Sequence, residues 1–325
     1  MNHSKKHFIA GFLSYVIWGF VPIFFKEISD HDPYEIIFYR IGIAALVISV
    51  FLSFDIKKSW SDISLLYSRS LKDFAVMLLL NAIGASLLLV NWITYVYVVN
   101  NVSVNAGAFA YLILPIITTF LAFFILNEKL NPFKWAGVIL SGISCYLMAH
   151  IDIHQIMYIA CVTFSYSFYM ITQRRNTFLN RKISLTIQMI IGAGIMLFVN
   201  PAPATGTILD LHFWIFISIV AVAFTITPLL LNLYALNGME SSQLAFLIYI
   251  NPISSFLIGL LVYHEKLDPL AVIAYALLGI SIIIFNWDLI LKILERSTGI
   301  TLKPIPVEVE IDIIETQIKP DDTKR

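Results

Sequence analysis

Arg40 is the side chain with the clearest chemical potential in this sequence, because it stands inside an apolar stretch long enough to span a membrane. An arginine at the centre of such a helix costs about 2.5–3.5 kcal/mol on insertion scales. It therefore usually faces a water-filled cavity or a partner. Two interpretations stand about equally. Arg40 contacts an anion or a carboxylate of a ligand, or it has a structural role, reaching toward the membrane surface or pairing with the interfacial Glu35 about one helical turn away.

A second group of residues shares an amphipathic ring or an amide tip within an apolar stretch. Its members are Tyr15, Trp18, Asn91, Trp92, Tyr95, Tyr111, Tyr166, Tyr169, Asn232, Tyr249 and Asn251. An amide in lipid is costly unless it is hydrogen bonded, so the three asparagines must face protein or a cavity. For any one residue, a helix–helix contact or a place in the interfacial aromatic belt is the favoured interpretation. As a set, these residues indicate the lining of a substrate cavity.

Four prolines lie in or at the ends of apolar stretches, namely Pro22, Pro115, Pro228 and Pro252. Each removes an intrahelical hydrogen bond and permits a kink. Pro115 and Pro252 occupy equivalent positions in an internal repeat described below, which makes a paired hinge plausible. A static kink is the alternative.

Three other groups of residues indicate a functional role less clearly. The pairs Glu128-Lys129 and Glu265-Lys266 stand in tight loops, where a solvated ion pair with a turn role is favoured over gating. The segment 150–154, HIDIH, offers three metal ligands on one face but lacks an evident fourth, so we expect no metal site. Cys145 and Cys161 lie in apolar runs and are expected to be small packing residues. We expect no cofactor.

The composition requires lipid as the solvent for most of the chain. Hydrophobic residues make up 59% and charged residues 13% of the 325 positions, against about a quarter charged in an ordinary soluble domain. The mean hydropathy is +0.83. A formal net charge of zero indicates neither a nucleic acid nor another strongly charged partner.

Apolar stretches of roughly 17–25 residues predict transmembrane helices. We expect ten, at 7–26, 34–54, 73–99, 103–126, 133–150, 154–173, 184–200, 212–235, 242–263 and 269–290. The connectors carry turn chemistry, as in Asp32-Pro33 and Asn131-Pro132. The longest connector, 55–72, is expected to hold a short amphipathic helix on the membrane surface.

The basic residues fix the predicted orientation. With the N-terminus in the cytoplasm, every Lys and Arg falls on the inside except Lys26 and Lys266, which lie outside, and Arg40, which lies within a span. So strong a bias fits the positive-inside rule. We therefore expect a multi-pass protein of the plasma (inner) membrane with both termini cytoplasmic, and an uncleaved first helix.

An internal repeat divides the chain. Residues 108–148 and 245–285 align without a gap and share a proline (Pro115/Pro252), the tripeptide Glu-Lys-Leu, a second proline and a glycine. We expect two five-helix units at 1–150 and 151–290. Because five is odd, the second unit is inverted relative to the first, which suits alternating access. The polar segment 291–325 is expected to be a cytoplasmic tail, disordered rather than a docking strand.

The repeated block of a proline, about twelve apolar residues and E-K-L-x-P resembles the EamA-type drug/metabolite transporters, as does YVIWGFVP at 15–22. Glu35-Ile36 with Tyr39-Arg40-Ile41, the stretch NWITY at 91–95 with Asn100-Asn101, and LVYHE at 261–265 resemble the RarD branch of that family. The sixth predicted span, with SYSFY at 165–169, is close to the branch pattern. Tyr39 and Ala106 depart from it, since the branch usually has histidine and glutamate there.

The resemblance implies an all-α membrane fold of ten helices, with a central cavity lined by the first four helices of each half. It also implies export or exchange of small metabolites or drugs. We expect a secondary transporter, not an enzyme, because the sequence has neither a phosphate-cradling GxxxxGK[ST] loop nor an HExxH motif. Protons or a counter-substrate would drive it, and a homodimer is an alternative to the monomer. An intramembrane enzyme and a non-transporting scaffold or receptor are the competing hypotheses.

Overall fold

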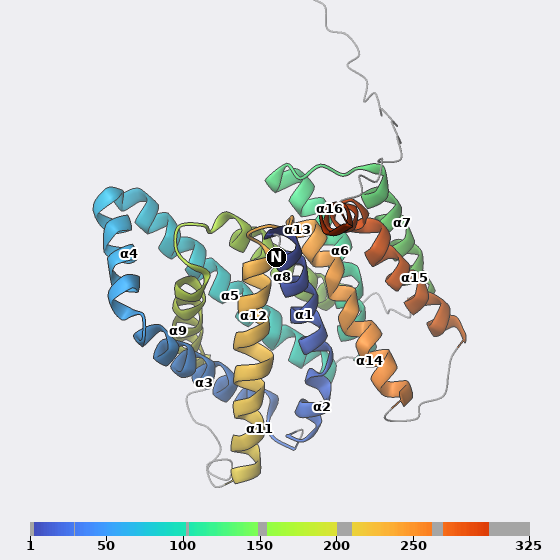
Figure 1. Cartoon of the computed structure of the whole chain (residues 1–325). Coiled ribbons are helices and arrows are strands. Elements are labelled where there is room, and N and C mark those ends of the chain that lie inside the picture. Colours follow the sequence, from blue (N-terminus) through green and yellow to red (C-terminus); the bar gives the residue numbers. More distant parts are fainter. Residues whose placement is uncertain are drawn as a thin grey trace, which may run out of the picture.

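The computed structural model describes residues 3–28, 30–101, 104–148, 155–199, 210–261 and 269–298, which are helical apart from short connections (Figure 1). The elements in chain order are α1 (His3–Gly19), α2 (Val21–Lys26), α3 (Pro33–Ser53), α4 (Ile56–Arg69), α5 (Leu71–Asn101), α6 (Val104–Leu126), α7 (Pro132–Leu147), α8 (Ile156–Arg175), α9 (Arg181–Val199), α11 (Leu211–Ala221), the π-helix η2 (Val222–Ile226), α12 (Thr227–Ala235), α13 (Ser241–Phe246), the 3₁₀-helix η3 (Leu247–Tyr249), α14 (Ile250–Leu261), α15 (Pro269–Phe285) and α16 (Trp287–Thr298).

Within the described residues, six helical segments are long and apolar enough to cross a membrane. They are Lys5–Phe25, Tyr34–Ser53, Leu71–Val98, Phe109–Leu126, Arg181–Val199 and Leu211–Ala235. A seventh arises if Val272–Phe285 and Trp287–Glu295, bent by 57°, form one span. The prediction of an all-helical membrane protein is confirmed. The other predicted ranges coincide with α7, α8 and α13–α14, and ten crossings stay a prediction.

The predicted turn residues start the helices by capping them. The side chain of Asp32 accepts hydrogen bonds from the backbone N–H groups of Tyr34 and Glu35, and Pro33 is the first residue of α3. Asn131 accepts from the N–H of Lys134 in the same way, with Pro132 opening α7. Proline suits this position because its missing N–H would have no partner inside the helix anyway.

Two helix pairs run antiparallel and join the two halves of the repeat. Lys182, at the start of α9, contacts the carbonyl of Phe51 near the end of α3. In α7 the Ser144 hydroxyl donates to the carbonyl of Ala274 in α15 at 2.8 Å, and further along Gly137 lies against Phe285. In the aligned repeat, α15 is the counterpart of α7. Figure 1 shows α7 and α15 side by side.

The packing partners are exchanged in the same pattern. Helix α1 packs against α12 and α14, whereas α8, the helix that opens the second half, packs against α5 and α6. Each half therefore contributes its leading helix to the core of the other half.

The two ends of the bundle differ in charge. Five cationic residues define what we call the basic end, namely Lys129, Lys134, Arg174, Arg181 and Lys182. Contacts tie their loops together: Arg174 donates to the carbonyl of Leu236, Arg181 to the side chain of Asn237, and Lys182 pairs with Asp55 at 2.9 Å. What we call the opposite end carries Glu27, His31, Asp210 and His212. There His31 lies 3.0 Å from Asp210, and His212 lies 3.7 Å from Glu27.

The predicted helix in the longest connector is confirmed as α4. Its Ile63 and Leu66 pack against a small core around Met77, while Trp60 is exposed. Residues 291–298, predicted as the beginning of the tail, continue α16. Residues 299–325, the segment 150–154 and the pair Glu265-Lys266 lie outside the described residues.

Candidate functional site

Arg40 lies in α3 with only 7% of its side chain exposed. Its Nε donates a hydrogen bond to the Thr225 hydroxyl at 2.6 Å, and its guanidinium carbon lies 4.5 Å from the Trp92 ring centre and 5.6 Å from that of Phe25. Among the described residues no carboxylate forms an ion pair with it, and its two Nη groups have no protein hydrogen-bond partner. No ion pair between Arg40 and Glu35 is found among the described contacts.

Thr225 reaches Arg40 because its helix contains a π-turn. Pro228 has no N–H, so it leaves the carbonyl of Phe224, four residues earlier, without that intrahelical bond. The backbone widens into η2, and the Trp18 indole N–H donates to the freed Phe224 carbonyl at 2.9 Å. Thr225 donates its own proton to the Val220 carbonyl, which leaves its oxygen free to accept from Arg40. Pi-turns of this kind are frequent at functional sites.

Asn91 organises the neighbouring side of the site. Its amide nitrogen donates to the carbonyl of Val162 at 2.8 Å and lies 3.4 Å from the Ser165 hydroxyl, and its oxygen accepts from the Tyr111 hydroxyl at 3.1 Å. The Tyr95 ring packs edge-on against Tyr111, with 5.1 Å between centroids. These contacts join α5, α6 and α8.

The other half supplies a similar arrangement. The amide nitrogen of Asn232 in α12 donates to the Tyr15 hydroxyl at 2.8 Å, and Tyr15 lies 5.4 Å from Trp18, centroid to centroid. Tyr166 and Tyr169 in α8 lie 5.7 Å apart and belong to the same buried cluster as Tyr15. Asn232 contacts α1 as Asn91 contacts α8, so the two asparagines perform corresponding tasks in the two halves.

Buried polar atoms in this cluster have hydrogen-bonding capacity to spare. The Oδ1 atom of Asn232 and the hydroxyl of Tyr169 are fully buried and have no partner among the described residues. Buried polar atoms are normally satisfied. These orphaned atoms can therefore receive polar groups of a ligand or ordered water.

One predicted residue, Tyr249, lies apart from this cluster. Tyr249 is fully buried against Phe246, with 5.5 Å between ring centroids, in a core shared with α7 and α15. The Oδ1 atom of Asn251 has no partner among the described residues. The two equivalent prolines also differ in setting: Pro115 lies inside the continuous α6, whereas Pro252 lies in the first turn of α14, after the helix has broken at η3.

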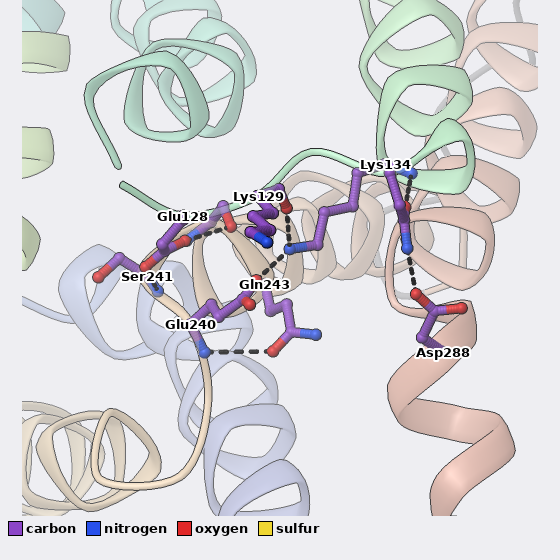
Figure 2. A network of polar contacts seen from close by, with 9 residues as sticks. Glu128, Lys129, Lys134, Glu240, Ser241, Gln243 and Asp288 are labelled. Atoms are coloured by element: carbon purple, nitrogen blue, oxygen red, sulfur yellow. Dashed lines mark hydrogen bonds and ion pairs between the residues drawn. The ribbon is translucent and has the colours of Figure 1, made fainter. Parts of the chain in front are cut away.

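A separate polar network lies at the basic end (Figure 2). Glu128 is only 9% exposed, and its two carboxylate oxygens accept from the backbone N–H groups of Ser241 and Ser242 and from the Ser242 hydroxyl. Its interpretation as a solvated ion pair with Lys129 is wrong. Instead, the ammonium group of Lys134 pairs with Glu240 and donates to the carbonyl of Lys129, whose own side chain is exposed.

Sequence reasoning missed Thr225 and the role of Glu128. Pro228 carried the signal for the first, because a proline frees the carbonyl four residues before it. The partners of Glu128 lie more than a hundred residues away along the chain, and no local pattern announces such a contact.

The comparisons with known proteins agree with this architecture. The family model described as "EamA-like transporter family" matches residues 5–149 and 154–287, which we call the first half and the second half. The "Uncharacterized transporter YojE" of Bacillus subtilis (strain 168) is 28% identical over 302 residues, covering 89% of this chain and 96% of that protein.

Two proteins named RarD are similar over almost the same region. That of Escherichia coli (strain K12) is 25% identical, covering 89% of this chain and 96% of its own, and that of Streptomyces exfoliatus is 25% identical, covering 88% and 90%. A crystal structure with a TM-score of 0.68 covers 88% of this chain and 99% of its own at 13% identity, which supports the fold alone.

Proposed function

The chain belongs to the EamA-like transporter family, and from this premise we propose that it is a secondary active transporter of small metabolites or drugs. It works as an exporter or exchanger in the plasma membrane, by alternating access. Relatives that cover nearly its whole length carry the names of transporters or of RarD. We propose no enzymatic activity.

The packing supports an arrangement of ten membrane spans in two inverted five-helix units. A two-fold axis lying in the membrane plane relates each helix of one unit to its counterpart in the other unit, and the two counterparts run in opposite directions across the membrane. The counterparts α7 and α15 run antiparallel, and the exchange of α1 and α8 between the two cores follows the same axis. Inverted repeats of this kind carry their substrate site between the halves, near the bilayer midplane.

The distribution of charge supports an orientation in which the basic end faces the cytoplasm. The basic connectors that the positive-inside rule assigns to the cytoplasm meet there through direct contacts, such as Lys182 with Asp55. Both chain termini are then cytoplasmic.

Arg40 is the residue we propose as the anion contact for the substrate. An isolated buried charge is strongly disfavoured, and removing a partner from a buried pair is costly for the same reason. A guanidinium whose two Nη groups and positive charge have no partner among the described residues therefore gains most from a ligand that brings an anionic group. Arginine suits this task because its fork of donors binds a carboxylate through two hydrogen bonds. This unpaired charge is the observation that carries the proposal.

The aromatic side chains around Arg40 are proposed to bind the apolar part of the substrate. Trp92 and Phe25 lie over the guanidinium, and Tyr15, Trp18, Tyr95, Tyr111, Tyr166 and Tyr169 extend the surface toward the second half. Asn91 and Asn232 hold this surface together. Tyr249, which lies in the neighbouring core with α7 and α15, and Asn251 are proposed to extend the lining from the second half. Pro115 and Pro252 are proposed as the hinges, because the helices that contain them differ in continuity. The preferred substrates are therefore small anions with an apolar body.

Uptake into proteoliposomes tests this function. The protein is reconstituted with a panel of labelled amino acids and aromatic carboxylates, first with a pH gradient and then with the same compounds preloaded inside. We expect saturable flux of at least one compound. Stimulation by the pH gradient would identify proton coupling, and stimulation by preloading would identify exchange.

The variants give the test its specificity. Arg40→Ala is expected to lower kcat/KM by about 30-fold or more, because truncating one partner of a buried charge pair costs ~2–5 kcal/mol. Arg69→Ala, which removes an exposed arginine of α4, is the matched control and should leave flux unchanged. Normal flux through Arg40→Ala would remove Arg40 from the site, and no flux from the wild type for any compound would contradict the proposal of transport.

A further inference from the structure

Glu128 lies in the connection between α6 and α7, where the backbone aims it inward. Asn127 has a left-handed backbone with φ of 55°, a conformation that few residues other than glycine adopt. The N–H of Glu128 then donates to the Ala122 carbonyl at 3.2 Å, which folds the chain back over the end of α6. The side chain that follows is buried at the boundary between the two halves.

Among the described residues, the hydrogen bonds of this carboxylate are all made to the other half of the protein. Its Oε1 atom accepts from the Ser241 N–H at 2.6 Å, and its Oε2 atom accepts from the Ser242 N–H at 3.1 Å and from the Ser242 hydroxyl at 2.5 Å. Charge-assisted hydrogen bonds of this kind are roughly twice as strong as neutral ones. Figure 2 shows the Glu128 side chain directed at the chain that leads into α13.

Two further contacts cross the halves beside it. The Lys134 ammonium pairs with Glu240, and the Asn131 amide donates to Asp288 at the start of α16. A pocket of about 370 Å³ lies next to these contacts, lined by Lys129, Lys134, Glu240 and Asp288 among others. The Glu128 contacts therefore belong to a group of contacts that join the two halves at this end.

We infer that Glu128 is a gating residue, whose carboxylate holds the basic end closed by binding Ser241 and Ser242 and must release them before that end opens. The inference rests on the proposed alternating-access function. It follows from the geometry that the two halves cannot separate at this end while one half accepts three hydrogen bonds from the other. The gate depends on the negative charge, because only a carboxylate presents acceptors to all three donors.

A cysteine introduced at a buried position near this end would report on its opening without any need for a transported compound. Ser14 in α1 is fully buried and lies one turn beyond Gly11, which contacts Leu244 of α13. We would place Ser14→Cys in a background with Cys145→Ala and Cys161→Ser, and measure its labelling by a membrane-impermeant maleimide. The labelling rate is measured in right-side-out and in inside-out vesicles, so that access from each side of the membrane is determined separately.

The expected result is faster labelling from the basic end when the carboxylate is lost. Glu128→Ala should raise the rate about tenfold or more, because each hydrogen bond to a charged group contributes ~1.5–3 kcal/mol. Glu128→Gln should also raise it, because its amide N–H₂ faces donors. Lys129→Ala removes the neighbouring exposed side chain and should leave the rate unchanged. Rates close to the wild type in both Glu128 variants would overturn the inference, even if transport that depends on Arg40 is observed.

A second reporter separates gating from unfolding. Ile217 is fully buried near the opposite end, so Ile217→Cys should stay protected in the Glu128 variants. If both reporters become reactive in Glu128→Ala, the milder Ser242→Ala variant decides, since it removes only one of the three hydrogen bonds. Ser242→Ala should raise the labelling rate of Ser14→Cys and leave that of Ile217→Cys unchanged. If Ser242→Ala raises the labelling rate of neither reporter, the inference is overturned. Faster labelling in a protein that moves no compound would leave the gate standing and remove the transport proposal.

Discussion

The two ends of the molecule are held together by different chemistry. At the basic end Glu128 and Lys134 are 9% and 5% exposed, and the Glu128 carboxylate accepts hydrogen bonds from three donors. At the opposite end the side chains of His212 and Glu27 are 55% and 50% exposed and lie 3.7 Å apart. Exposed ion pairs contribute little to stability, whereas buried, fully bonded charges are costly to disrupt. The contacts of Glu128 and Lys134 are therefore expected to be costlier to disrupt than the exposed pair of Glu27 and His212.

Corresponding helices of the two halves also differ, in this case in whether the helix is continuous. Helix α6 is continuous through Pro115, whereas its counterpart is divided into α13, η3 and α14 before Pro252. Similar sequence in the two halves has produced different backbone. In the proposed mechanism this is expected, because inverted units must adopt different conformations whenever the protein is open to one side only.

The largest effect is expected when the loss of stability on removing Glu128, at the basic end, is compared with the loss on removing Glu27, at the opposite end. Glu128→Ala should destabilise the protein by ~2–4 kcal/mol, because it leaves two buried N–H donors and a hydroxyl without an acceptor. Glu27→Ala should change stability by no more than about 0.5 kcal/mol, as exposed substitutions usually do. Denaturant unfolding of both variants in the same detergent measures the difference. Equal losses would contradict the contrast between the ends.

A smaller effect concerns the dependence of stability on pH at the opposite end. The N–H of Phe213 lowers the pKa of Asp210 below its ordinary value, and the His31 side chain adds to this. The native pKa is therefore lower than the unfolded one. The stabilisation is complete above the ordinary Asp pKa of about 3.9 and is lost as pH falls through the native value.

Asp210→Asn should accordingly lower Tm slightly at neutral pH and match the wild type at a pH well below 3.9. Asp55→Asn is the matched variant at the basic end, because the pKa of Asp55 is also lowered, chiefly by the hydrogen bond from Lys182. Its side chain is likewise exposed, so we expect the same small, pH-dependent difference. A loss as large as that of Glu128→Ala in either variant would show that burial does not set the strength of these contacts.

Much of the architecture could be predicted from the sequence because lipid imposes strong local rules. Apolar length and the capping residues Asp32 and Asn131 placed the helices, and the bias of the basic residues predicted which connectors meet at one end. The sequence predicted one continuous first span and did not predict the break in the helix at Phe20. Whether the helix continues there or ends at Gly19 and begins again at Val21 depends on contacts that hydropathy does not record.

The candidate site was predictable only in part. Arg40 stood out because a charge in an apolar run is rare, and Asn91 and Asn232 because an amide there needs a partner. Their actual partners, the carbonyl of Val162 and the hydroxyl of Tyr15, are set by which helices meet. Glu128 was misread for the same reason, since a loop carboxylate is solvated unless a distant segment buries it.

The preference for anionic substrates tests the central claim most directly. For a carboxylate that the wild type transports and its uncharged amide analogue, the ratio of the two kcat/KM values is measured in the wild type, Arg40→Lys and Arg40→Ala. We expect a ratio of about 30 or more in the wild type, a lower ratio in Arg40→Lys, and a ratio near unity in Arg40→Ala. A preference for the anion that survives unchanged in Arg40→Ala would contradict the assignment of Arg40 as the substrate contact.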